Sequence, residues 1–152
     1  MTTDSESYET TIEVGKPPRH VFECIIDVSK WWGGKDLKGS TRRLEDEFTI
    51  THGDVHYSRQ RTVELVPDRK VVWLITESRL AWLESDQHEW TNTRLIFELA
   101  PDGDGTVLHF RHEGLVPALE CYSRCAAGWN LVIKDYLLNF IARGRVAAQL
   151  YA

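Results

Sequence analysis

Hydrophobic and polar residues alternate near the start of the chain, over residues 8–14. A period of two is typical of a strand with one buried face, so we expect a half-buried strand there. Pro17 and Pro18 suit the first turn of a helix, and apolar residues then fall on one face over residues 21–26. Residues 31–40 begin with two tryptophans and two glycines, and we expect them to form a loop.

Residues 44–114 consist mainly of short alternating or β-branched segments that are separated by turn residues. Turns are indicated by THGD at 51–54, by PDRK at 67–70 and most clearly by DGDG at 102–105. The pattern predicts a run of antiparallel strands, of which the first ends near residue 50 and the others cover residues 55–65, 71–76, 80–83, 90–99 and 106–112.

The hydrophobic period changes to three and four after Pro117, where apolar residues form one stripe from Leu119 to Phe140. This spacing predicts an amphipathic helix, for which Gly144 is a suitable stop. A helix of about 25 residues is roughly 37 Å long. The diameter expected for a globule of this size is roughly 30 Å. We therefore expect the helix to cross the whole domain.

The order of these elements predicts the fold class. Strands that are followed by a helix on one face of an antiparallel sheet belong to the α+β class. We expect a helix-grip fold, in which a curved antiparallel sheet of six or seven strands surrounds the long C-terminal helix and short helices follow the first strand. Residues 1–7 are predicted to be a flexible tail, and residues 8–152 a single domain.

Composition and charge narrow the class of protein further. Hydrophobic residues form 42% of the chain and charged residues 27%, which excludes a disordered protein. The net charge of −5 disfavours binding to nucleic acid. No apolar run is long enough to span a membrane, and the acidic N-terminus is unlike a secretion signal. We therefore expect a cytoplasmic protein in which the three thiols, Cys24, Cys121 and Cys125, are free.

The six histidines and three cysteines do not form a recognisable metal site. His52 and His56 would lie about 13 Å apart on one strand, whereas zinc ligands lie about 2 Å from the metal. The chain contains no CxxC, HExxH or GxSxG motif and no glycine-rich nucleotide-binding loop. The sequence therefore predicts no catalytic residue, no metal ligand and no cofactor.

The inner faces of the predicted elements indicate which residues would surround a cavity between the sheet and the long helix. Apolar walls with a few polar groups are typical of small-molecule pockets. The mouth of the cavity is expected near residues 31–34. The predicted lining consists of Trp31, Trp32, Thr91, Thr93, Leu95, Phe97, Leu108, Phe110, His112, Tyr122, Trp129, Ile133 and Tyr136.

Some of these positions leave alternatives open. His112 is either a hydrogen-bonded histidine at a strand end, or a ligand contact or acid–base group, since histidine titrates near neutral pH. Either one of Trp31 and Trp32 caps the cavity while the other packs beneath it, or both anchor the loop. Gly128 costs the helix about 1 kcal/mol relative to Ala, which a close approach of helix and sheet would offset.

Four segments, taken in order, resemble one protein family. They are PPRHVFECIIDVSKWW at 17–32, VPDRKVVW at 66–73, DGDGTVLHFRHEGL at 102–115 and the helical GW at 128–129. Together they resemble the heat-shock-protein ATPase activator homologue-like family, within the START-like, birch-pollen-allergen-type (SRPBCC) superfamily. The resemblance covers about residues 8–145. It implies a helix-grip fold with a cavity for apolar or amphipathic molecules, and it implies no shared catalytic set.

The resemblance and the residues leave three functions open. The first is binding of an apolar or amphipathic small molecule. The second is a cyclase, dehydratase or hydrolase that uses the same cavity, with His112 as base. The third is a protein–protein module that partners a regulator or chaperone. A homodimer is also kept open.

Overall fold

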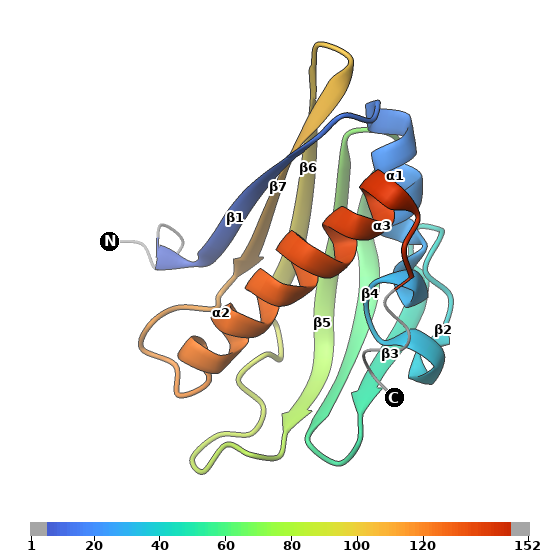
Figure 1. Ribbon diagram of the computed structural model, residues 1–152. Helices are drawn as coiled ribbons and strands as arrows, with labels where there is room; N and C mark the ends of the chain where they lie inside the picture. Colours follow the sequence, from blue (N-terminus) through green and yellow to red (C-terminus); the bar gives the residue numbers. More distant parts are fainter. Residues whose placement is uncertain (1–5, 147–152) are drawn as a thin grey trace.

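The computed structural model describes residues 6–146, in which a curved antiparallel sheet wraps one side of a long C-terminal helix (Figure 1). Neighbouring strands lie in the order β1-β7-β6-β5-β4-β3-β2. The predicted α+β, helix-grip architecture is therefore confirmed. The strands are β1 (Tyr8–Val14), β2 (Lys38–Gly39), β3 (Glu47–His52), β4 (His56–Val66), β5 (Lys70–Leu80), β6 (Arg94–Asp102) and β7 (Gly105–Glu113).

Helices cover the concave face of this sheet. The first, α1 (Pro18–Ile26), has proline in its first turn and is followed by two short helices, η2 (Val28–Lys30) and η3 (Gly34–Asp36). The long helix consists of α2 (Tyr122–Leu131), η4 (Val132–Leu137) and α3 (Leu138–Arg143), which run on without a break (Figure 1). It ends where Gly144 adopts a φ of 69°, which confirms the predicted stop.

A π-helical segment keeps the apolar face of the long helix on the sheet. Its buried residues lie four apart, whereas residues four apart in an α-helix rotate by about 40° around the axis. The segment η4 is a π-helix, which turns less per residue and corrects this drift. The apolar face therefore stays on the sheet along the whole helix. The buried residues are Cys121, Cys125, Trp129, Ile133, Leu137 and Ile141.

Irregular pairing between the two longest strands accompanies the curvature of the sheet. The register between β4 and β5 shifts after Arg59 and again after Thr62. An extra residue in one strand bends it and increases its twist. The two irregularities therefore contribute to the curvature of the sheet.

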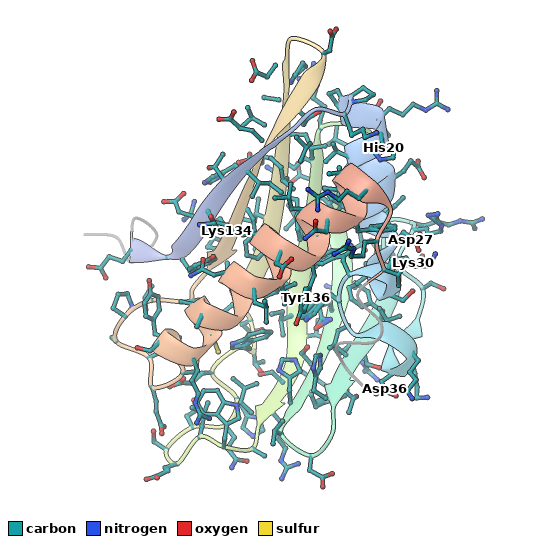
Figure 2. The ribbon with its side chains drawn as sticks, in the orientation of Figure 1. His20, Asp27, Lys30, Asp36, Lys134 and Tyr136 are labelled. Atoms are coloured by element: carbon teal, nitrogen blue, oxygen red, sulfur yellow. The ribbon has the colours of Figure 1, made fainter. Side chains whose placement is uncertain are left out.

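The core between helix and sheet is a continuous group of aromatic rings. Trp31 and Trp32 stack on each other and on Trp73 of β5, with ring centroids 6.2–6.4 Å apart. The group continues through Trp32 to Trp129 of α2, at 5.2 Å, and from Trp129 to Phe110 of β7, at 4.7 Å. Figure 2 shows side chains filling the space between the long helix and the strands.

The segment between β5 and β6 corrects the sequence prediction. The predicted strand at 80–83 does not form, because Leu80 ends β5 and residues 81–93 make a loop. The predicted strand at 90–99 begins only at Arg94, since Asn92 has a φ of 71° that breaks extended structure. Thr91 and Thr93 continue the alternation of Leu95 and Phe97 in the sequence, but they belong to this loop, in which Trp90 is buried. The predicted loop at 31–40 also contains η3 and the two-residue strand β2.

The structure describes only part of the predicted tail and part of the predicted domain. Of the predicted tail 1–7, residues 1–5 lie outside the described residues, as do residues 147–152 of the predicted domain. Ser7 is buried and its hydroxyl accepts a hydrogen bond from the Gly114 N–H at 3.0 Å, so the folded part includes Ser7. Within residues 6–146, no helix is both long and apolar enough to cross a membrane.

Trp129→Ala is expected to lower the free energy of unfolding by about 3–5 kcal/mol, because it removes a buried indole from the aromatic core. Leu131→Ala, two residues away on the same helix, is the control, since Leu131 is 46% exposed. Urea denaturation of the three proteins measures the difference. Equal midpoints for Trp129→Ala and Leu131→Ala would show that Trp129 does not hold the helix to the sheet.

Candidate functional site

An apolar cleft of about 280 Å³ opens between the long helix and the loops that connect the strands. It lies where β3, β4 and β5 extend beyond the first turns of α2 (Figure 1). The side chains around it come from five separate segments of the chain. They are Trp32, His52, Val55, His56, Leu80, Trp82, Trp90, Arg124, Cys125, Gly128, Trp129 and Val132.

Four indole rings line this cleft, and two of them, Trp82 and Trp90, come from the loop between β5 and β6. Trp90 stacks on Trp129 with centroids 5.8 Å apart and an interplanar angle of 12°. The Trp32 ring lies tilted against Trp129, with centroids 5.2 Å apart. His56 packs edge-on against Trp90 at 5.0 Å. Flat aromatic walls favour flat apolar molecules, because aromatic rings stack or meet edge to face.

The outer part of the cleft carries one positive charge. The Arg124 guanidinium lies 4.8 Å from the centroid of the partly exposed Trp82 ring. Arg124 itself is exposed, so its charge stays in contact with solvent. The inner part of the cleft is therefore aromatic and uncharged, and only its rim is cationic.

Gly128 forms part of the helical wall of the cleft. A β-carbon added at this position would meet no atom within 4 Å outside the local helix backbone. The expected close approach of helix and sheet at Gly128 is therefore wrong. The glycine instead leaves open space, since a larger side chain at this position would extend into the cleft.

His112 is held as a neutral ring by two hydrogen bonds. The Trp129 indole N–H donates to its Nδ1 at 3.0 Å, and its Nε2 lies 2.8 Å from the Thr93 hydroxyl. That hydroxyl donates to the Trp90 carbonyl, so it accepts from the Nε2–H of His112. Burial lowers the pKa of His112 to about 3. Of the two alternatives for His112, the geometry is that of a hydrogen-bonded histidine, and neither ring nitrogen is left to act as a base.

Cys125 places a thiol on the wall of the cleft. Its sulfur accepts a hydrogen bond from the Trp90 indole N–H at 3.3 Å. The thiol of Cys121 also donates to it, and this is the main influence that lowers the pKa of Cys125. Burial opposes the lowering, and the Trp90 N–H contributes to it. The three cysteines are free. Among residues 6–146, no group of His, Cys, Asp and Glu has the arrangement of a metal site.

Comparison with known proteins identifies the family. The sequence model of the family described as Activator of Hsp90 ATPase homolog 1-like protein matches residues 16–139. The chain belongs to this family. The resemblance of its sequence segments to that family is thereby confirmed. A search of curated protein sequences finds no significant match.

Solved structures with the same fold are distant in sequence. The Aha1 dimer from Colwellia psychrerythraea, a solution structure, superposes with a TM-score of 0.72 at 16% identity, over 91% of this chain and 97% of that one. DynU16, titled a putative protein in the dynemicin biosynthetic locus, gives 0.67 at 15% identity, over 93% of this chain and 49% of that one. CalU16 from Micromonospora echinospora gives 0.63 at 17% identity, over 90% and 76%. These likenesses show a shared fold.

Two of the residues predicted to line a cavity, Trp32 and Trp129, line this cleft. Tyr122 and Tyr136 are only partly buried on the helix, where Tyr136 is labelled in Figure 2. The others do not line it. Trp31, Leu95, Phe97, Leu108, Phe110, His112 and Ile133 are core residues, and Thr91 and Thr93 belong to the loop that holds Trp90.

Several cleft residues could not be predicted from the sequence, because they lie in or next to loops and turns. Trp90 belongs to a loop that reads as a strand, and Val55 and His56 follow the turn at 51–54. The one available signal was Gly128, a glycine within a helical stripe.

The buried histidines predict a loss of stability in acid. His112 has a pKa of about 3 in the folded chain, against about 6.5 for an unperturbed histidine. Below about pH 6.5 the unfolded chain therefore binds a proton that the folded chain does not, and stability falls as the pH falls toward 3.

At pH 5, protonation of the unfolded His112 is expected to lower the free energy of unfolding by about 2 kcal/mol. The pKa of His56 is also lowered to about 3, first by burial and then by His52, so His56 adds to this loss of stability. Urea denaturation from pH 8 to pH 5 measures it, and His56→Phe should make the pH dependence shallower. A free energy that stays constant or rises over this range contradicts the neutral histidines.

Proposed function

We propose that this chain binds a small, mainly apolar and aromatic molecule in the cleft between the long helix and the ends of β3, β4 and β5. The observation that carries the proposal is the combination of an indole-lined cleft with Gly128 on its helical wall. A glycine within a helix is unfavourable by about 1 kcal/mol relative to Ala. No packing contact accounts for Gly128, whereas an occupant of the cleft does.

The lining supports a flat apolar occupant over a charged one. Trp32, Trp90 and Trp129 present aromatic surface, and Val132 and Leu80 add aliphatic surface. Small-molecule sites typically combine such walls with few polar groups. The volume of about 280 Å³ suits a ligand of two or three rings. Arg124 at the rim is placed to contact a polar substituent that reaches solvent.

The two other functions have weaker support. An enzyme that uses His112 as base is disfavoured, because both ring nitrogens of His112 are hydrogen-bonded within the core. A protein–protein module would need a continuous exposed apolar patch. Within residues 6–146, the exposed large apolar side chains belong to separate segments, namely Leu44, Val55, Val66, Leu131 and Val146.

A second copy of the chain is the other partner that the comparisons favour, since the Colwellia psychrerythraea protein is titled a dimer. We infer that this chain also forms a homodimer. Multi-angle light scattering over a dilution series is expected to give twice the chain mass of 17.5 kDa at high concentration. A mass that stays at one chain at every concentration would overturn this inference.

Gly128→Leu is expected to abolish binding of an uncharged fluorescent probe, N-phenyl-1-naphthylamine, which should bind the native chain at one site. The leucine side chain would occupy the cleft, and leucine is a good helix former. Ala127→Leu is the matched control, because Ala127 is exposed and does not line the cleft. Probe fluorescence and quenching of tryptophan emission measure binding, and thermal denaturation confirms that both variants fold.

The proposal fails if the probe does not bind the native chain. It also fails if folded Gly128→Leu binds the probe as tightly as Ala127→Leu does, since the cleft is then not the binding site.

A further inference from the structure

Strand β4 carries a row of three buried polar residues, where most buried residues of the other strands are apolar. Ser58, Gln60 and Thr62 alternate along the strand and are at most 1% exposed. Gln60 lies between two apolar residues, Phe48 on β3 and Ile75 on β5, whereas Ser58 lies opposite Ser78 on β5. Ser58 has a partner, because its hydroxyl lies 3.1 Å from Nε2 of His56. The other two do not.

Four polar atoms in this region lack a hydrogen-bond partner among the described residues. They are Nε2 and Oε1 of Gln60, Oγ1 of Thr62 and Nε1 of Trp73. A buried polar atom without a partner typically costs the folded state about 1–3 kcal/mol. Most buried polar groups in proteins are satisfied, so a group of unsatisfied ones requires an explanation.

The residues that carry these atoms are neighbours on one face of the sheet. Thr62 of β4 lies directly opposite Trp73 of β5, and Gln60 is the next residue on the same face of β4. Residues that are opposite or diagonal on one face of a sheet lie within about 8 Å of each other. Together the group offers donors from Gln60, Thr62 and Trp73, and acceptors from Gln60 and Thr62.

Trp32 lies between this group and the cleft. Its ring stacks on Trp73 with centroids 6.4 Å apart, and the same residue lines the cleft. A ligand that turns the Trp32 ring aside would extend from the cleft to Gln60, Thr62 and Trp73. Because no Asp, Glu, Lys or Arg is among the buried residues of 6–146, nothing there would compensate an ionised group.

We propose that Gln60, Thr62 and the Trp73 indole N–H form a polar subsite for the uncharged, hydrogen-bonding end of an aromatic ligand, and that Trp32 closes this subsite when no ligand is bound. The ligand class is an aromatic amide, phenol or similar neutral molecule. This inference rests on the proposed function, because the aromatic part of the ligand occupies the cleft described above.

The proposal predicts opposite effects on stability and on binding. Gln60→Met and Thr62→Val replace unsatisfied polar groups by apolar groups of similar shape. Each should raise the melting temperature by about 2–4 °C. Each should also raise the Kd for 2-naphthamide roughly three- to tenfold. The Kd for 2-methylnaphthalene, which has no polar end, should change less than about twofold.

The chain offers matched controls whose side chains are satisfied. Gln87 donates to the Ala81 and Leu83 carbonyls at 3.1 and 3.2 Å, and the buried Thr106 donates to the Lys16 carbonyl at 2.7 Å. Gln87→Met and Thr106→Val should therefore lower the melting temperature and leave both Kd values unchanged. Displacement of N-phenyl-1-naphthylamine measures the Kd values.

A direct signal comes from the indole N–H of Trp73, assigned in ¹⁵N-labelled protein with the Trp73→Phe variant. It should move downfield when 2-naphthamide binds, and should not do so with 2-methylnaphthalene. The ionised 2-naphthoate should bind more weakly than 2-naphthamide.

The subsite is overturned if Gln60→Met and Thr62→Val lower the melting temperature as their controls do, or if they leave the Kd for 2-naphthamide unchanged. If both naphthalenes bind and Gly128→Leu blocks them equally, the cleft function stands and only the subsite fails. If neither naphthalene binds the native chain, the proposed function itself fails.

Discussion

The rest of the structure depends on how the long helix is held against the sheet by Trp129. Its indole N–H donates to His112 on β7, and its ring contacts Trp32, Trp90 and Phe110. Because His112 is fully buried, its ring needs partners for both nitrogens. Trp129 supplies one and Thr93 the other. Helix, strand and the loop before β6 are therefore fixed by one neutral imidazole.

This arrangement explains why a cleft remains beside the core. Hydrogen bonds hold Trp90 and Trp129 in a stack, so neither ring is free to turn into the space next to them. Gly128 has no side chain to fill the same space. The polar row on β4 is comparable, because the unpartnered atoms of Gln60 and Thr62 lower the stability of the free chain in a region adjoining the cleft. The glycine and the polar row are unfavourable for the stability of the free chain, and a bound molecule would account for both.

The hydrophobic periodicity of the sequence, together with its turn residues, is sufficient to predict the regular strands and the long helix. The alternation at 8–14, the DGDG turn and the apolar stripe after Pro117 correspond to β1, the β6–β7 hairpin and the long helix. The π-helical turn at 132–137 was not predictable from that stripe, because steps of three and four also fit an ordinary helix. The end of the loop at 81–93 was predicted as a strand, since Thr91 and Thr93 continue the alternation of Leu95 and Phe97 beyond the start of β6.

The candidate site was only partly predictable, for a related reason. Trp32 and Trp129 were identified because they lie on the faces of predicted elements. Gln60 and Thr62 were not, because polar residues on a strand suggest a solvated face until the register shows that they point inward. Which polar atoms lack partners is a property of three-dimensional packing. It has no counterpart in the pattern of the chain.

The central claim is that the cleft beside Trp90 and Trp129 holds an uncharged aromatic molecule. The most direct test is a set of intermolecular nuclear Overhauser effects between unlabelled 2-naphthamide and the isotope-labelled chain. The account predicts contacts from the naphthalene protons to the Trp90 and Trp129 rings and to the Gly128 α-protons. Contacts confined to the convex face of the sheet, or none at saturating ligand, would contradict it.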